Sequence, residues 1–109
     1  MKRKKRKVVK VVNKYKIGKK NPLTDIYIGK GTIVGNPFTV KEFGRGEAIR
    51  LYKIHFDYMM QHSQEFRDYV GIATEYDNLV CYCAPKRCHG DILKDWIDQH
   101  RKLNSLITE

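Results

Sequence analysis

The sequence predicts an α/β domain with a short sheet of about three strands, which we expect to be parallel, packed by two main helices in two or three layers. Three observations support this fold class. Short apolar runs, the first of them rich in valine, occur at residues 8–12, 25–28 and 78–83. Residues 45–60 and 88–107 place apolar side chains three and four residues apart, which is the period of an amphipathic helix. The order strand, strand, helix, strand, helix completes the pattern.

The first half of the chain contains two of the strands and two loops. Residues 8–12 are almost all valine and predict the first strand. Residues 13–23 form a basic loop that contains Gly18 and Pro22. The second strand, residues 25–28, leads directly into residues 29–38, which are too rich in glycine and proline for regular structure.

The second half contains the helices and the third strand. The first helix begins near residues 45–47 and runs to about Met60. Ser63 caps a short second helix through Tyr69, and Gly71 ends it. The third strand, residues 78–83, is followed by a turn at 84–87 and by the last helix, which starts between residues 88 and 91.

Composition limits the class of protein. A chain of 109 residues is long enough for one domain with a modest core. It has no apolar run near the roughly 20 residues that a membrane span needs, and its basic start lacks the apolar stretch of a secretory signal. Three closely spaced cysteines do not resemble a disulfide framework, so we expect a reducing, intracellular setting.

The positive charge is concentrated at the N-terminus. Eleven of the 22 Lys and Arg residues lie in residues 1–20, which contain no acid, whereas the remaining residues carry all 12 acids. We expect residues 1–7 to be a flexible basic arm and residues 8–109 to be one domain. The arm is either a solubility tail, a nuclear localisation signal or a nucleic-acid contact. The candidate nucleic-acid-binding residues are Lys2, Arg3, Lys4, Lys5, Arg6 and Lys7.

All three cysteines fall within eight residues and are followed by a histidine. Thiolate and imidazole are good zinc ligands, so Cys81, Cys83, Cys88 and His89 are candidate ligands of a zinc ion. Adjacent ligands at 88 and 89 are awkward, because neighbouring side chains diverge. The alternatives are that the thiols form a reactive site or that they are small buried core residues.

The reactive-site interpretation depends on the start of the last helix. At a helix N-terminus the dipole favours an anion, which would lower the pKa of Cys88. His89, or His55, is the candidate base, and Asp91 would cap the helix or orient a histidine. Cys88, His89 and Asp91 are therefore the candidate catalytic residues. The same helix start, with Lys86 and Arg87 beside it, is also a candidate anion pocket.

The glycine-rich loop is the second candidate site. Its spacing fits neither a Walker A motif nor a dinucleotide fingerprint. It is either a structural loop or a cradle whose backbone N–H groups approach a phosphate. The candidate ligand-binding residues are Gly29, Lys30, Gly31, Thr32, Gly35, Asn36, Lys86 and Arg87. If the strands are parallel, both loops meet at one edge of the sheet and share one ligand.

These blocks resemble a family of small proteins of unknown function from phages, other viruses and bacteria. The resemblance rests on Tyr27-Ile28-Gly29 leading to Gly35-Asn36-Pro37-Phe38, on Gly44-Arg45-Gly46-Glu47-Ala48, and on Cys81-Tyr82-Cys83-Ala84-Pro85 leading to Cys88-His89-Gly90-Asp91. It covers about residues 8–100. It implies that the loops belong to one domain type, and it implies no established activity.

Together these observations predict a small intracellular, viral protein that binds a phosphate-bearing ligand, either nucleic acid or a nucleotide. One alternative is an enzyme that acts on a nucleotide or nucleobase through a reactive cysteine or a zinc-bound water. A second alternative is a viral interaction protein that inhibits a host factor. No membrane partner is expected, and zinc is the one cofactor that the residues suggest.

Overall fold

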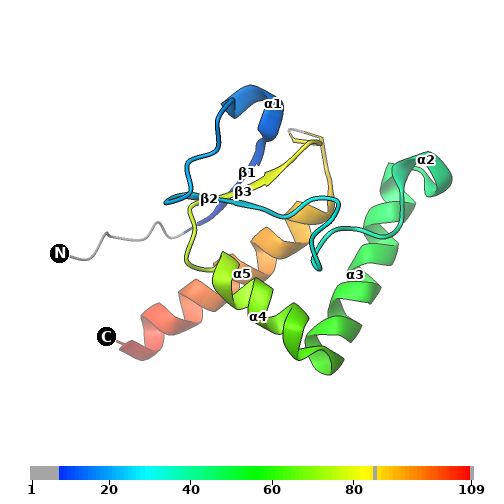
Figure 1. Ribbon diagram of the computed structural model, residues 1–109. Helices are drawn as coiled ribbons and strands as arrows, with labels where there is room; N and C mark the ends of the chain where they lie inside the picture. The colour runs from blue at the N-terminus through cyan, green and yellow to red at the C-terminus, as the bar shows by residue number, and fades with distance from the viewer. Residues whose placement is uncertain (1–7, 85, 109) are drawn as a thin grey trace.

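The computed structural model describes residues 8–84 and 86–108 (Figure 1). The expected arm at residues 1–7 lies outside the described residues. Within them, a three-stranded sheet is formed by β1 (Lys10–Asn13), β2 (Asp25–Tyr27) and β3 (Asn78–Cys81). The helices are α1 (Lys14–Ile17), α2 (Val40–Phe43), α3 (Arg45–His62), α4 (Gln64–Ala73) and α5 (His89–Thr108).

The sheet has the strand order β1-β3-β2, and both pairings are parallel. Lys10 and Asp25 both pair with Asn78, so the three strands start level with one another. This arrangement confirms the predicted α/β fold with a short parallel sheet. The chain leaves every strand at the same side, which we call the carboxyl edge.

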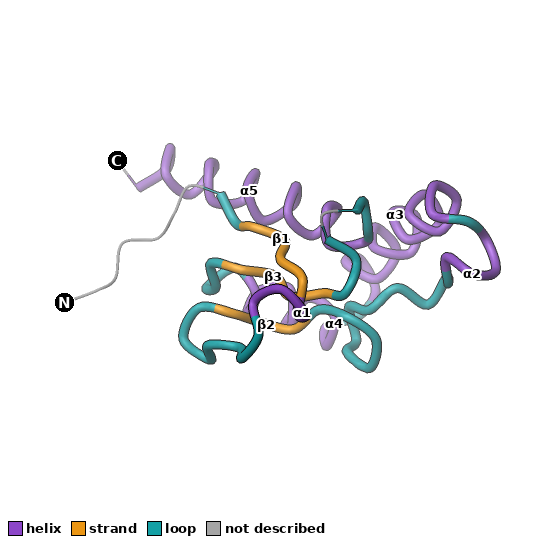
Figure 2. The backbone as a smooth tube through the Cα atoms, turned by 90° about the horizontal axis from the view of Figure 1, so that it is seen from above, coloured by secondary structure: helices purple, strands orange, loops and turns teal. Residues whose placement is uncertain are grey.

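The core lies between the sheet and the three long helices. Helix α5 runs alongside β1 and β3, and α3 and α4 pack against it (Figures 1 and 2). Strand β3 and the three long helices contribute fully buried side chains, and burying one large apolar side chain stabilises the fold by about 1.5–3 kcal/mol. The largest fully buried side chains are Tyr52, Phe56, Phe66, Ile28, Leu79, Leu93 and Ile97.

Polar contacts hold α5 to the first strand. The Val9 N–H donates to Asp98 Oδ1 at 2.8 Å, and Lys94 Nζ donates to the Val9 carbonyl at 3.0 Å. Lys94 also pairs with Asp98 at 2.6 Å. The backbone that enters β1 is therefore satisfied by the helix as well as by the sheet. None of the helices in the described residues is both long and apolar enough to cross a bilayer.

Two short helices were not predicted from the sequence. Helix α1 lies inside the predicted loop 13–23, because the Asn13 side chain accepts the Tyr15 N–H and caps a single turn. Helix α2 follows the predicted loop 29–38 and is capped by Thr39, whose hydroxyl accepts the Glu42 N–H. In each helix, one polar side chain accepts the backbone N–H of a residue two or three positions further along the chain.

Two element ends also differ from the prediction. Strand β3 ends at Cys81, so Cys83 is not on the same strand face as Cys81. Helix α4 continues past Gly71 to Ala73, because Gly71 is exposed and adopts a helical conformation without strain. The predicted cap of α4 is confirmed, since Ser63 Oγ accepts the Phe66 N–H at 3.1 Å.

The close approach of Gly35 to Gly29 yields a first prediction. A Cβ at residue 35 would lie 2.6 Å from the Gly29 carbonyl oxygen, whereas a Cβ at Gly46 in α3 meets nothing within 4 Å. Gly35→Ala should therefore lower the free energy of unfolding by about 1–3 kcal/mol, as overpacking does. Gly46→Ala should leave stability unchanged or raise it by up to about 1 kcal/mol. Urea unfolding of both variants checks this, and equal stabilities would contradict it.

Candidate functional site

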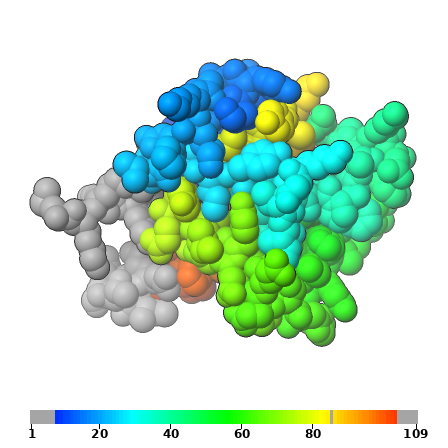
Figure 3. Space-filling view, in the orientation of Figure 1, coloured from blue at the N-terminus to red at the C-terminus, as the bar shows by residue number. Residues whose placement is uncertain are grey.

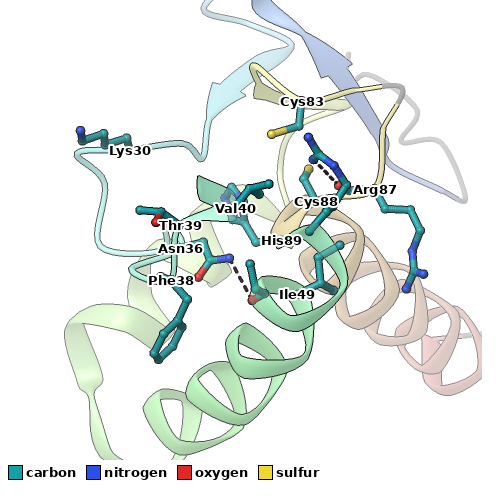
Figure 4. A pocket seen from close by; sticks show the side chains of 12 residues that line it. Lys30, Asn36, Phe38, Thr39, Val40, Ile49, Cys83, Arg87, Cys88 and His89 are labelled. Carbon is teal, nitrogen blue, oxygen red and sulfur yellow. Dashed lines mark hydrogen bonds between the residues drawn. The ribbon is translucent and has the colours of Figure 1, made fainter. Parts of the chain in front are cut away.

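The loops after β2 and β3 lie side by side at the carboxyl edge. Together with the start of α3 they line a cavity of about 160 Å³ (Figure 4). The expected convergence of the two loops is confirmed, while a shared ligand stays a prediction. The cavity is lined by Lys30, Asn36, Phe38, Thr39, Val40, Arg45, Ala48, Ile49, Cys83, Arg87, Cys88 and His89.

His89 connects α5 to the end of β2. It is buried, and its Nε2 lies 2.7 Å from the Ile28 carbonyl oxygen, while its ring packs edge-on against Tyr52 with centroids 5.1 Å apart. Burial lowers the pKa of the imidazole, so the neutral ring donates Nε2–H to the carbonyl. Nε2 is thus engaged in holding two elements together, and the lone pair of the neutral ring is on Nδ1.

Cys88 and Asp91 cap α5 reciprocally. Cys88 Sγ accepts the Gly90 N–H at 3.4 Å, and Asp91 Oδ2 accepts the Cys88 N–H at 3.1 Å. This arrangement is related to a capping box, with cysteine and aspartate in place of the usual residues, except that the sulfur accepts the second rather than the third N–H of the helix. The expectation that Asp91 caps the helix is therefore confirmed.

The two buried thiols interact directly. Cys81 Sγ and Cys88 Sγ are 3.6 Å apart. The hydrogen bond from Cys88 lowers the pKa of Cys81, and backbone N–H groups of Cys83 and Ala84 add to this effect. The same bond and burial raise the pKa of Cys88. The expectation of a lowered pKa at Cys88 finds no support, because burial and the neighbouring sulfur of Cys81 raise the pKa of this thiol.

The four candidate zinc ligands do not form one cluster. Cys83 is half-buried and lines the cavity, whereas Cys81 and Cys88 are buried beside each other and His89 is bound to Ile28. Across residues 8–84 and 86–108, no group of three or more His, Cys, Asp or Glu side chains is placed to hold a metal ion. The geometry thus gives the zinc hypothesis no support.

The polar side chains of the glycine-rich loop bind the protein's own backbone. Thr32 Oγ1 donates to the Gly29 carbonyl at 2.8 Å and closes a turn. Asn36 Nδ2 donates to the Ala48 carbonyl at 3.2 Å and fastens the loop to α3. Gly31 has a φ of 97°, which a side chain rarely tolerates. The Lys30 side chain is exposed and extends away from the cavity (Figure 4).

Arg45 is a site residue that the sequence-based prediction missed. Its Nη1 donates to the Arg87 carbonyl at 2.8 Å, which ties α3 to the loop after β3. The sequence signal that could have identified Arg45 was its position in the Gly44–Ala48 block, one of the three on which the family resemblance rests. Lys86 and Arg87, which were predicted, are exposed beside the cavity.

The carboxyl edge carries an unbalanced charge. The segments that follow the strands, residues 14–24, 28–41 and 82–90, contain no Asp or Glu. In the space-filling view the first of these segments and the third form one continuous surface, with the second beside them (Figure 3). Residues 19–24 run back to the start of β2, where Lys20 lies beside Asp25. The cations of these segments that remain at the carboxyl edge are Lys14, Lys16, Lys30, Lys41, Lys86 and Arg87.

Over residues 6–99 the chain matches the family described as Domain of unknown function (DUF4326). The protein is a member of DUF4326. No curated protein and no solved structure matches it. The matched range contains the sheet, the cavity and the three basic segments of this chain.

Burial predicts the order in which the thiols react. Cys83 is half-buried, whereas Cys81 and Cys88 are each no more than 4% exposed. Alkylation of the native protein with iodoacetamide should therefore modify Cys83 first, and the other two only after denaturant is added. Peptide mass mapping at successive times would show this order, and early labelling of Cys88 would contradict the structure.

The buried imidazole predicts a loss of stability in acid. The pKa of His89 is lowered below its unfolded value of about 6.5, so the unfolded chain takes up the proton first as pH falls. The free energy of unfolding should therefore decrease as pH falls through about 6.5. His89→Gln removes the titration and keeps an amide donor for Ile28, so its stability should depend less on pH.

Urea unfolding between pH 8 and pH 5 measures this dependence. The free energy of unfolding of the His89 variant will still depend on pH to some extent, because burial also lowers the pKa of His55. His62→Gln, at an exposed helix end, is the matched control and should behave like the natural protein. Identical pH dependence of the His89 variant and the natural protein would show that His89 does not cause the loss.

Proposed function

We propose that this DUF4326 protein binds a phosphate-bearing ligand, a nucleic acid or a nucleotide, at the carboxyl edge of its sheet. One observation carries the proposal: the segments that leave the three strands converge at this edge and place six cations there, Lys14, Lys16, Lys30, Lys41, Lys86 and Arg87. Ligands of parallel α/β sheets bind outside the carboxyl ends of the strands. A cationic surface without carboxylates attracts polyanions by releasing their counterions.

Two recesses at this edge differ in size. The cavity of about 160 Å³ is well below the roughly 300–1,000 Å³ of pockets that enclose a small-molecule ligand, so it suits a single group of a larger ligand. A second recess of about 480 Å³ adjoins it along the glycine-rich loop, between Gly31 and His55, and is large enough for a nucleotide. The arm at residues 2–7 would add sequence-independent attraction. The three unpaired thiols support a reducing, intracellular setting, as a phage or viral protein in its host would have.

Two lysine pairs test this proposal. Lys16 and Lys86 are exposed on two different segments of the carboxyl edge. Lys10, at the start of β1, and Lys102, late in α5, are equally exposed but lie away from that edge. Lys16→Gln/Lys86→Gln should weaken binding to a single-stranded oligonucleotide several-fold. It should also flatten the slope of log affinity against log salt by roughly 0.7 for each phosphate that the variant no longer neutralises.

Fluorescence anisotropy at several salt concentrations gives both quantities. Lys10→Gln/Lys102→Gln removes the same net charge and is expected to bind nearly as well as the natural protein. An equal loss of affinity in both double variants would mean that only net charge matters. The carboxyl edge would then not be the binding site.

A further inference from the structure

Three tyrosines meet at the carboxyl edge, one from the end of each strand. Tyr15 lies two residues after β1, Tyr27 is the last residue of β2, and Tyr82 is the first residue after β3. The ring centroids of Tyr15 and Tyr82 are 4.9 Å apart, and those of Tyr82 and Tyr27 are 5.9 Å apart. Tyr82 is therefore the centre of a continuous aromatic cluster, which we call the tyrosine platform.

The outer rings of the platform are not part of the core. Tyr15 is 81% exposed and Tyr82 is 48% exposed. Tyr52 and Tyr69, by contrast, are buried or half-buried and donate their hydroxyls to the Val34 and Tyr27 carbonyls. An exposed aromatic patch on a small protein is typical of an interaction site. Packing within the domain does not explain why Tyr15 is aromatic.

The platform is nevertheless held in place. The Asn13 side chain accepts the Tyr15 N–H at 2.8 Å, and its Nδ2 donates to the Ala84 carbonyl at 2.7 Å and to the Tyr82 carbonyl at 3.3 Å. A single amide thus fixes the backbone under both exposed rings. The ring of Tyr27 rests over Gly29, where a Cβ would collide with it. Preorganised rings lose little entropy when a ligand stacks on them.

Cations surround the platform. Lys14 and Lys16 flank Tyr15 in α1, and Lys86 lies on the same loop as Tyr82. The three segments around the rings contain no acid. Proteins that bind single strands combine a positive surface with aromatic side chains on which bases stack. A duplex hides the faces of its bases, so this combination suits a single strand.

We propose that Tyr15 and Tyr82 stack on bases of a single-stranded nucleic acid, while Tyr27 supports Tyr82 from below. This inference rests on the proposed function and names its ligand. The rings of Tyr15 and Tyr82 are tilted by 52° to one another, so they would present separate faces to successive bases. The neighbouring lysines would contact the phosphates between them.

The test separates stacking from charge. The full chain and its variants Tyr15→Ala and Tyr82→Ala are titrated into labelled oligo-dT and oligo-rU of about 15 nucleotides, the upper range of single-strand site sizes, and into polyphosphate of similar charge. Each variant should bind both oligonucleotides roughly tenfold more weakly, because one base no longer stacks. Polyphosphate affinity and the salt slope should not change. Tyr15→Phe keeps the stacking face and should bind like the natural protein.

Tyr58→Ala is the matched control, because Tyr58 is 60% exposed on α3, away from the platform. Oligonucleotide binding that survives both platform variants would overturn the stacking proposal and leave the proposed function standing. Equal losses for oligonucleotide and polyphosphate would also overturn it, since bases would then play no part. If the natural protein binds neither probe, the proposed function fails as well. Urea unfolding confirms that the exposed positions do not affect folding.

Discussion

The parallel pairing of β3 with both β1 and β2 is the constraint on which the rest of the structure depends. Because all three strands run the same way, their following segments emerge together at the carboxyl edge, although β3 lies more than 50 residues from either partner in the chain. Helices α3 and α4 supply the crossover that parallel strands require. A change in strand direction would place the tyrosines, the cavity and the cations at different ends of the molecule.

Side-chain bonds to main-chain groups hold this edge together. His89 binds the Ile28 carbonyl, Tyr52 the Val34 carbonyl, Asn36 the Ala48 carbonyl and Arg45 the Arg87 carbonyl. Each such bond contributes about 1 kcal/mol net, and a buried carbonyl left without its donor costs about 1–3 kcal/mol. Irregular loops leave many such groups unpaired, so polar residues there serve the fold first. That is why candidate site residues such as Asn36 and His89 use their side chains to bind main-chain carbonyls.

The fold was predictable from sequence to a greater extent than the site. Apolar spacing of Ile49, Tyr52 and Phe56 predicts α3 directly, and runs of β-branched residues predict strands, because these signals are local. The direction of the thiol pKa shifts was not predictable, because it depends on a contact between Cys81 and Cys88 that only the folded turn creates. The tyrosine platform had no local signal either, since its members are brought together solely by the strand order.

The segment after β3 serves both faces of the candidate site. Tyr82 faces outward to the platform, and the next residue, Cys83, lines the cavity (Figure 4). Neighbouring side chains that point apart therefore place an aromatic surface and a small recess one residue apart. A nucleic-acid strand that stacks on Tyr82 would pass the mouth of the cavity with its backbone or its next base. The cavity is too small for a whole nucleotide, so it suits a single group of a ligand whose main contacts lie on the platform and its lysines.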